Sequence, residues 1–138
     1  MKTEKILLPR NLVQQMFHQA QASPDSEVCG LISAANGEVR HCYPVANVAG
    51  EPAHLFDMDP QGQVRALREI RERGETLFAI YHSHPHGPAQ PSRHDIQRSH
   101  YPDVAQLIVS LADPDRPQVR AFRIIGAEVL EIEVHAIV

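Results

Sequence analysis

Apolar residues recur along this chain at two spacings, one typical of amphipathic helices and the other of buried strands. The helical spacing comes first, directly after Pro9, a residue suited to the first turn of a helix. The apolar stripe of this predicted helix comprises Leu12, Val13, Met16, Phe17 and Ala20. Ser23-Pro24-Asp25 ends it.

Short apolar runs bounded by turn residues predict several strands. Asn36-Gly37 is a strong hairpin signal, and a second hairpin is expected to turn near Gly126. The predicted strands cover residues 6–8 (an edge strand), 27–33, 39–43, 53–56, 77–81, 107–111, 119–125 and 128–134.

Two further helices are expected between these strands. Asp59-Pro60 places an N-cap and an N1 proline at the start of one helix, and Gly74 ends it. Its apolar face is predicted to comprise Val64, Leu67 and Ile70. Its arginines are interleaved with glutamates, which favours a solvated helix face over a phosphate or nucleic-acid patch. Residues 92–99 are predicted to form a short helix.

Length and composition fit one soluble domain over residues 1–138, large enough to bury a core without disulfides. A net charge of −4 gives no electrostatic case for nucleic-acid binding, and no apolar run approaches the roughly 20 residues of a membrane span. In a hairpin centred on Asn36-Gly37, residue 29 faces 44 and residue 42 faces 31. Cys29 and Cys42 are therefore expected to be reduced thiols in a cytoplasmic protein.

The chemistry concentrates in residues 82–95. Side chains alternate faces along a strand, so Phe78, Ile80, His82 and His84 are expected to share one face and the two imidazoles to converge. An isolated His-x-His is more often a pair of partly exposed histidines at a strand end. His86, His94 and His100 lie nearby, and the sequence assigns them no role.

Ser92-x-x-Asp95 has two interpretations. It is close to a capping box, which is the common use of this spacing. The Pro/Gly-rich loop before it, however, can turn the first turn of the helix back against His82 and His84. Two imidazoles and a carboxylate then provide three metal ligands, and an open fourth position is the mark of a catalytic zinc site.

Hydrolysis also requires a group that moves a proton. Glu27 is the best candidate, because it begins an otherwise apolar predicted strand and Gly30 permits close backbone approach. The alternative is an ordinary solvent-facing glutamate at a strand end.

The run Glu27-Val28-Cys29-Gly30-Leu31-Ile32, followed by His-x-His-Pro, a seven-residue spacer, Ser, two residues and Asp, resembles the signature of the JAMM (MPN+) metallopeptidases. Asn47, Phe56 and Asp59-Pro60 resemble features of the small bacterial members. The resemblance implies an α+β fold, in which helices flank a curved mixed β-sheet of the MPN/cytidine-deaminase-like type.

The resemblance also implies the site. His82, His84 and Asp95 would bind one Zn²⁺ with water as fourth ligand, Glu27 would act as general base and then acid, and Ser92 would donate to the oxyanion. Its substrate class is a peptide or isopeptide bond after the Gly-Gly tail of a ubiquitin-like or sulfur-carrier protein. The alternatives are a non-catalytic MPN scaffold, a RadC-like protein of DNA-repair context, and a purely structural zinc site.

Overall fold

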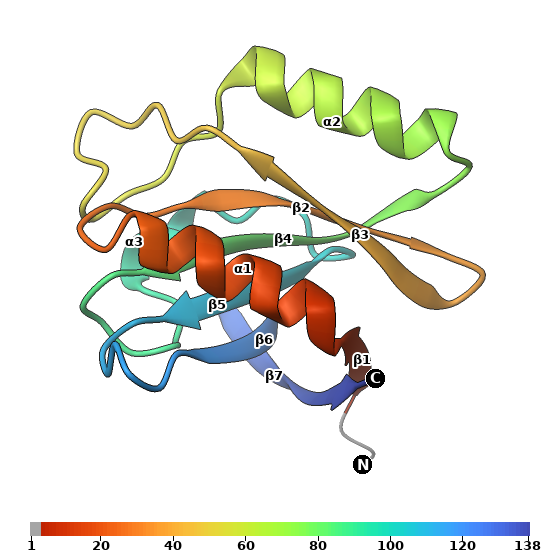
Figure 1. Ribbon diagram of the computed structural model, residues 1–138. Helices are drawn as coiled ribbons and strands as arrows, with labels where there is room; N and C mark the ends of the chain where they lie inside the picture. The colour runs from red at the N-terminus through yellow and green to blue at the C-terminus, as the bar shows by residue number, and fades with distance from the viewer. Residues whose placement is uncertain (1–3) are drawn as a thin grey trace.

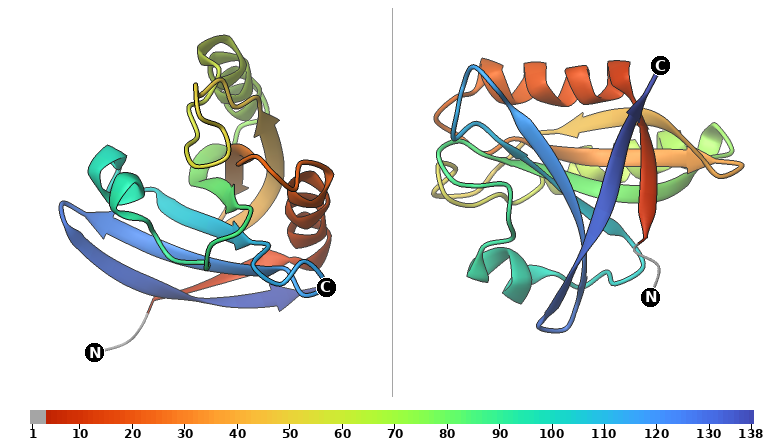
Figure 2. Two further views of the ribbon diagram at one scale, coloured as in Figure 1. Left: turned by 90° about the vertical axis from the view of Figure 1, so that its left-hand side faces the viewer. Right: turned by 90° about the horizontal axis from the view of Figure 1, so that it is seen from below.

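A seven-stranded mixed sheet forms the centre of the computed structural model, which describes residues 4–138 (Figure 1). The strand order is β1-β7-β6-β5-β4-β2-β3, with β1/β7 and β4/β5 parallel and the other pairs antiparallel. Figure 2 shows how strongly the sheet curves. The strands are β1 (Lys5–Pro9), β2 (Cys29–Ala35), β3 (Glu38–Val45), β4 (Thr76–His84), β5 (Ala105–Ser110), β6 (Gln118–Ile125) and β7 (Glu128–Ile137). The predicted curved mixed sheet with flanking helices is confirmed.

The helices α1 (Arg10–Ala22) and α2 (Pro60–Glu72) cover opposite faces of this sheet, and the short α3 (Arg93–Arg98) follows β4 (Figures 1 and 2). The predicted stripe of α1 is confirmed: four of its five residues are buried, and Phe17 packs at the edge of the core. Ile32, Ala79 and Tyr81 of β2 and β4 lie in the same core cluster. Within the described residues, no helix combines the length and apolar character needed to cross a bilayer.

Helix α2 begins as predicted but buries a different face. The Asp59 side chain accepts a hydrogen bond from the Gly62 N–H at 3.1 Å, and Pro60 occupies the first turn. Ala66 and Ile70, one turn apart, are the buried residues that pack on the sheet. The prediction that Val64 and Leu67 belong to the buried face is wrong, since these side chains are 56% and 38% exposed.

The β2–β3 hairpin turns at Asn36-Gly37, as predicted, with both residues at positive φ. Its pairing register is shifted by an irregularity between Ile32 and Ala34, so Cys29 faces Val45 and Cys42 faces Ile32. The predicted pairing of residue 29 with 44 and 42 with 31 is therefore wrong. Both cysteines are nevertheless free thiols, as expected. The strand also begins at Cys29 rather than Glu27, because residues 27 and 28 bond outside the regular ladder.

A second irregularity, between β2 and β4, corrects the predicted face of Phe78. Ile32 pairs with Ala79 but Ser33 pairs with Leu77, so one residue of β4 is left over at Phe78. Phe78 consequently packs against the α1-side core, whereas Leu77 and Ile80 pack under α2. The alternation resumes beyond this bulge.

Residues 53–56, predicted as a strand, instead lie in an irregular segment that spans residues 46–59 and forms only one isolated bridge, between Asn47 and Met58. The Asn47 side chain organises this segment. Its Nδ2 donates to the Glu27 and Leu55 carbonyls at 2.9 and 3.0 Å, and its Oδ1 accepts from the Asp57 N–H at 2.9 Å. The segment is thereby fixed against Glu27 without belonging to the sheet.

Candidate metal centre and active site

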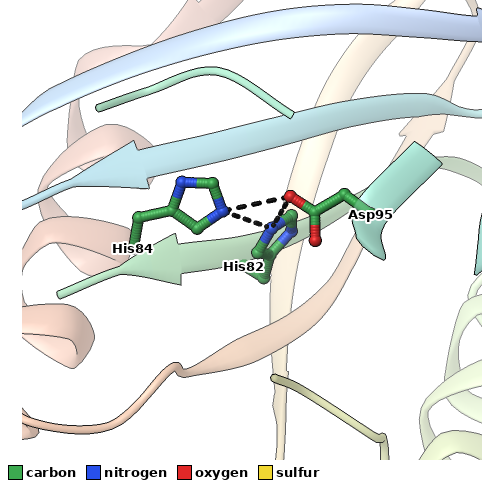
Figure 3. Close-up of side chains that lie close together, drawn as sticks. All are labelled: His82, His84 and Asp95. Atoms are coloured by element: carbon green, nitrogen blue, oxygen red, sulfur yellow. Dashed lines mark hydrogen bonds and ion pairs between the residues drawn. The ribbon is translucent and has the colours of Figure 1, made fainter. Parts of the chain in front are cut away.

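Three donor atoms meet at the carboxyl end of β4 (Figure 3). His82 and His84 project from one face of the strand, and Asp95 reaches them from α3. The His82 Nε2, His84 Nε2 and Asp95 Oδ2 atoms are each 3.1 Å from the other two. Among the histidine, cysteine and acidic side chains of residues 4–138, these three have ligand atoms close enough together to hold one metal ion. The structure therefore brings together the three residues that the sequence singled out.

Backbone carbonyls at the end of β4 and in the loop before α3 accept hydrogen bonds from Ser110 and Leu111, and these bonds help to direct Asp95 back towards the strand. Ser110 Oγ donates to the Gly87 carbonyl at 2.7 Å, and the Leu111 N–H donates to the His84 carbonyl at 3.1 Å. Both contacts anchor the loop to β5 and to the residue that follows it.

Ser92 and Asp95 form a complete capping box, as the first interpretation of their spacing predicted, and Asp95 also returns to His82 and His84. Ser92 Oγ accepts from the Asp95 N–H at 3.0 Å, and Asp95 Oδ2 accepts from the Ser92 N–H at 2.9 Å. The same Oδ2 atom faces both imidazoles. The cap therefore fixes the carboxylate oxygen that completes the donor set.

Neighbouring groups also fix the two imidazoles. His84 Nδ1 donates to the Pro88 carbonyl at 2.8 Å, so Nε2 carries the lone pair when the imidazole is neutral and donates to Asp95 Oδ2 when it is protonated. The His82 ring is fully buried and stacks on Phe56, with ring centroids 4.5 Å apart and planes 22° apart. The sequence did not identify the role of Pro88, or that of Ser83, whose hydroxyl binds the Val28 N–H. A serine between two histidines and a proline carbonyl in a loop form no distinctive sequence pattern.

Electrostatics at the donors favours a bound cation. Burial raises the pKa of Asp95, but hydrogen bonds from His82 and His84 outweigh burial and hold that pKa well below its ordinary value. Burial lowers the pKa of His82 and so keeps that imidazole neutral. Burial acts in the same direction on His84, but its hydrogen bonds to Asp95 and Pro88 prevail and raise its pKa. The site thus attracts positive charge, either as a proton on His84 or as a metal ion that replaces it.

The donor set fits zinc in particular. A tetrahedral Zn²⁺ with ligands at about 2.0–2.1 Å holds those ligands about 3.3 Å apart, close to the observed spacing. Two imidazole nitrogens and one carboxylate oxygen are common zinc ligands and leave one tetrahedral position open. His86 is exposed and lies 3.6 Å from Asp25, outside this set.

Glu27 lies beside the donors because its neighbours are tied to β4. The Val28 N–H donates to Ser83 Oγ at 2.9 Å, the Ser83 N–H donates to the Val28 carbonyl at 2.9 Å, and Cys29 pairs with His82. The next strand position, Gly30, has no room for a Cβ beside the Tyr81 hydroxyl. The segment that begins at Glu27 therefore runs alongside the end of β4.

The Glu27 carboxyl is buried, only 6% exposed, and its Oε1 atom has no hydrogen-bond partner among the described residues. Burial raises the pKa of Glu27 from 4.5 to about 7, and the Asp95 charge adds to the rise while His84 opposes it. A carboxyl with this pKa can both accept and release a proton near neutral pH. The alternative of a solvent-facing glutamate at a strand end does not fit this burial.

The raised pKa of Glu27 predicts a pH-dependent stability of the metal-free protein. The folded-state pKa of about 7 exceeds the ordinary 4.5. The stabilisation by the bound proton is therefore complete below about pH 4.5 and lost as the pH rises through 7. In chelator, Glu27→Gln should raise the free energy of unfolding by about 2–3 kcal/mol more at pH 8 than at pH 5. Urea titrations of wild type and variant at pH 5 and pH 8 measure this difference.

The exposed Glu51→Gln is the matched control. If Glu27→Gln changed the free energy of unfolding equally at both pH values, the prediction would be contradicted.

Comparison with known proteins places this geometry in a family. The family described as prokaryotic homologs of the JAB domain matches residues 9–125. The CysO-cysteine peptidase of Mycobacterium tuberculosis is 29% identical over 96% of this chain and 91% of its own length. A desampylase of Haloferax volcanii is 36% identical over 66% of this chain and 67% of its own.

Solved structures agree with the family assignment. A protein from Desulfitobacterium hafniense superposes with a TM-score of 0.86 at 32% identity, over 96% of this chain and 92% of its own. A JAB1/MPN domain protein from Archaeoglobus fulgidus, 21% identical over 94% of this chain and 97% of its own, shares the fold with a TM-score of 0.60. The chain therefore belongs to the prokaryotic branch of the JAB (JAMM/MPN) domain family and is a hydrolase.

Proposed function

We propose that this protein is a zinc-dependent peptidase that cleaves the bond after the C-terminal Gly-Gly tail of a ubiquitin-like or sulfur-carrier protein. We name the three metal-donor atoms of His82, His84 and Asp95 the donor triangle. The observation that carries the proposal is this donor triangle with a buried, unpartnered Glu27 carboxyl beside it. The free thiols of Cys29 and Cys42 support a reducing compartment such as the cytoplasm.

His82, His84 and Asp95 would hold the zinc ion, one per chain. When bound there, zinc lowers the pKa of a coordinated water from about 15.7 to about 7 and polarises the scissile carbonyl. Glu27, with its pKa near 7, accepts the proton of the attacking water and then delivers it to the leaving nitrogen.

Ser92 stabilises the developing oxyanion in this proposal. Its hydroxyl oxygen accepts from the Asp95 N–H, but the hydroxyl proton is not used by any hydrogen bond among the described residues. That proton is free to donate toward the carbonyl oxygen of the substrate. Ser92, Glu27 and His84 line the same hollow, which is also bordered by Ala53, His54 and the loop after β4.

The names of relatives support the substrate class. Besides the CysO-cysteine peptidase and the desampylase, a Thermus thermophilus protein described as a probable TtuB-protein conjugate cleaving protease is 34% identical over 70% of this chain and 64% of its own length. A non-catalytic scaffold needs no intact donor set, so the complete triangle argues against that alternative. A purely structural zinc site would leave Glu27 without a role.

A carrier-cleavage assay tests the proposal. CysO and TtuB are each extended by one residue beyond a C-terminal Gly-Gly and incubated with the zinc-loaded protein, and mass spectrometry follows loss of the added residue. We expect cleavage of at least one carrier, abolished by a chelator and restored by zinc. Absence of cleavage by protein with one zinc per chain, or cleavage that survives removal of the zinc, would contradict the proposal.

A further inference from the structure

Two hollows adjoin the donor triangle, and the proposed function uses only one of them. We name the hollow lined by Glu27, His84 and Ser92 the tail groove. The second, which we name the α3 pocket, has His82, Asp95, Asp57, Arg98 and Tyr101 among its lining residues. We propose that the α3 pocket binds the residue released by hydrolysis and that Arg98 binds its free α-carboxylate. This inference rests on the proposed function and adds the specificity for the leaving group.

The two hollows differ in volume and lining, and these differences suit the tail of the carrier to the tail groove and the leaving residue to the α3 pocket. The tail groove measures about 310 Å³ and is bordered by the backbone of a Pro/Gly-rich loop, which suits an extended tail without side chains. The α3 pocket measures only about 170 Å³, below the roughly 300–1,000 Å³ of pockets that hold drug-sized ligands. It therefore accommodates one residue rather than a length of chain.

The lining of the α3 pocket suits an amino acid. Ile80, Ile108 and Ile124 provide apolar surface for a side chain. The polar lining residues include His100, Tyr101 and Gln106.

Arg98 supplies the positive charge. Its Nη1 donates to the Phe56 carbonyl at 3.1 Å, and its Nη2 forms an exposed ion pair with Asp57 Oδ1 at 3.5 Å. These contacts hold the guanidinium at the wall of the pocket but occupy only two of its five N–H donors. The remaining donors can bind a carboxylate with two hydrogen bonds, an arrangement for which arginine is well suited.

The position of Arg98 along α3 sets the length of the leaving group. Arg98 is three residues after Asp95, so the two side chains are neighbours on one helix face, about 5–6 Å apart at Cβ. The α-carboxylate of a single leaving residue lies three bonds beyond the scissile carbonyl carbon, about 4 Å away by standard backbone dimensions. We expect the carboxylate of a single leaving residue to reach Arg98, whereas a longer leaving chain presents an uncharged peptide group there.

The test compares two forms of one carrier that the enzyme cleaves, each extended by a single alanine after Gly-Gly. One form ends in the free carboxylate and the other in a C-terminal amide. We expect the wild-type kcat/KM to be about 10- to 100-fold higher for the acid, the effect of one pair of charge-assisted hydrogen bonds. Arg98→Gln should lose this preference by slowing only the acid, and Arg98→Lys should restore part of it.

Two controls separate the inference from other causes. Arg93→Gln removes the same charge from an exposed position at the start of α3 that lines neither hollow, and should change neither rate. Binding of both forms to the zinc-loaded Glu27→Gln variant by calorimetry gives a readout without turnover, and should show the same preference for the acid. Equal rates and affinities for acid and amide, or an equal loss of both in Arg98→Gln, would overturn the inference. Failure to cleave either form of any carrier would instead contradict the proposed function, and the inference with it.

Discussion

Replacing Glu27 with glutamine is expected to lower kcat by about 10²–10⁴-fold while the protein keeps one zinc ion per chain. Glutamine preserves the shape of the side chain but cannot accept or deliver a proton. Glu27 is not part of the donor triangle, so the metal affinity should remain. Steady-state kinetics on a cleaved carrier, paired with metal analysis of the same sample, measures both quantities.

The exposed Glu51→Gln is the matched control, because it makes the same chemical change in the segment that packs beside Glu27. Its kcat should equal that of wild type. Full activity of Glu27→Gln with zinc bound would overturn the assignment of Glu27 as the proton carrier. Loss of zinc in that variant would show that Glu27 acts through the metal site instead.

Removal of the Ser92 hydroxyl should lower kcat by about 10²–10³-fold without changing zinc affinity, the effect seen when one oxyanion donor is lost. Ser92 also caps α3, so alanine alone is not a clean test. Alanine at an N-cap costs about 0.5–2 kcal/mol of stability, whereas glycine costs only a few tenths. Ser92→Gly therefore removes the donor and largely keeps the helix.

The two variants separate catalysis from capping. If Ser92 donates to the oxyanion, Ser92→Ala and Ser92→Gly lose kcat to the same extent, and Ser92→Thr, which keeps a hydroxyl, recovers most of it. If Ser92 serves only as a cap, Ser92→Gly stays close to wild type in kcat. Zinc titration of each variant shows whether the donor triangle has survived.

The donor triangle could be predicted because its determinants are local. His82 and His84 share a strand face by simple alternation, and a short loop of proline and glycine returns Asp95 to them. Glu27 is 55 residues from His82 in the sequence; local pattern made it a candidate, as an acid that begins an apolar predicted strand, and the resemblance to a known signature then assigned its role.

Features that depend on tertiary contacts could not be predicted from the sequence. The extra residue at Phe78 comes from the way β4 pairs with β2, and no local signal marks that bulge. The irregular path of residues 46–59 depends on one asparagine that bonds to distant backbone groups. Val64 and Leu67 have the right periodicity for burial, but α2 contacts the sheet through Ala66 and Ile70. The α3 pocket was likewise not foreseen, because its walls come from five separate segments: residues 56–63, 80–82, 94–101, 106–108 and 124.

Helix α3 has six residues and buries none of them, so its position depends on its cap, on the Asp95 side chain and on the contacts of Arg98 with Phe56 and Asp57. The Asp95 oxygen that completes the cap is also the oxygen that faces the two imidazoles. If zinc binds there as proposed, folding of this helix and binding of the metal are linked equilibria, and each stabilises the other by the same free energy. A cell short of zinc would then hold a protein with a less stable α3, and the proposed catalysis and the proposed selection of the leaving residue by Arg98 would weaken together.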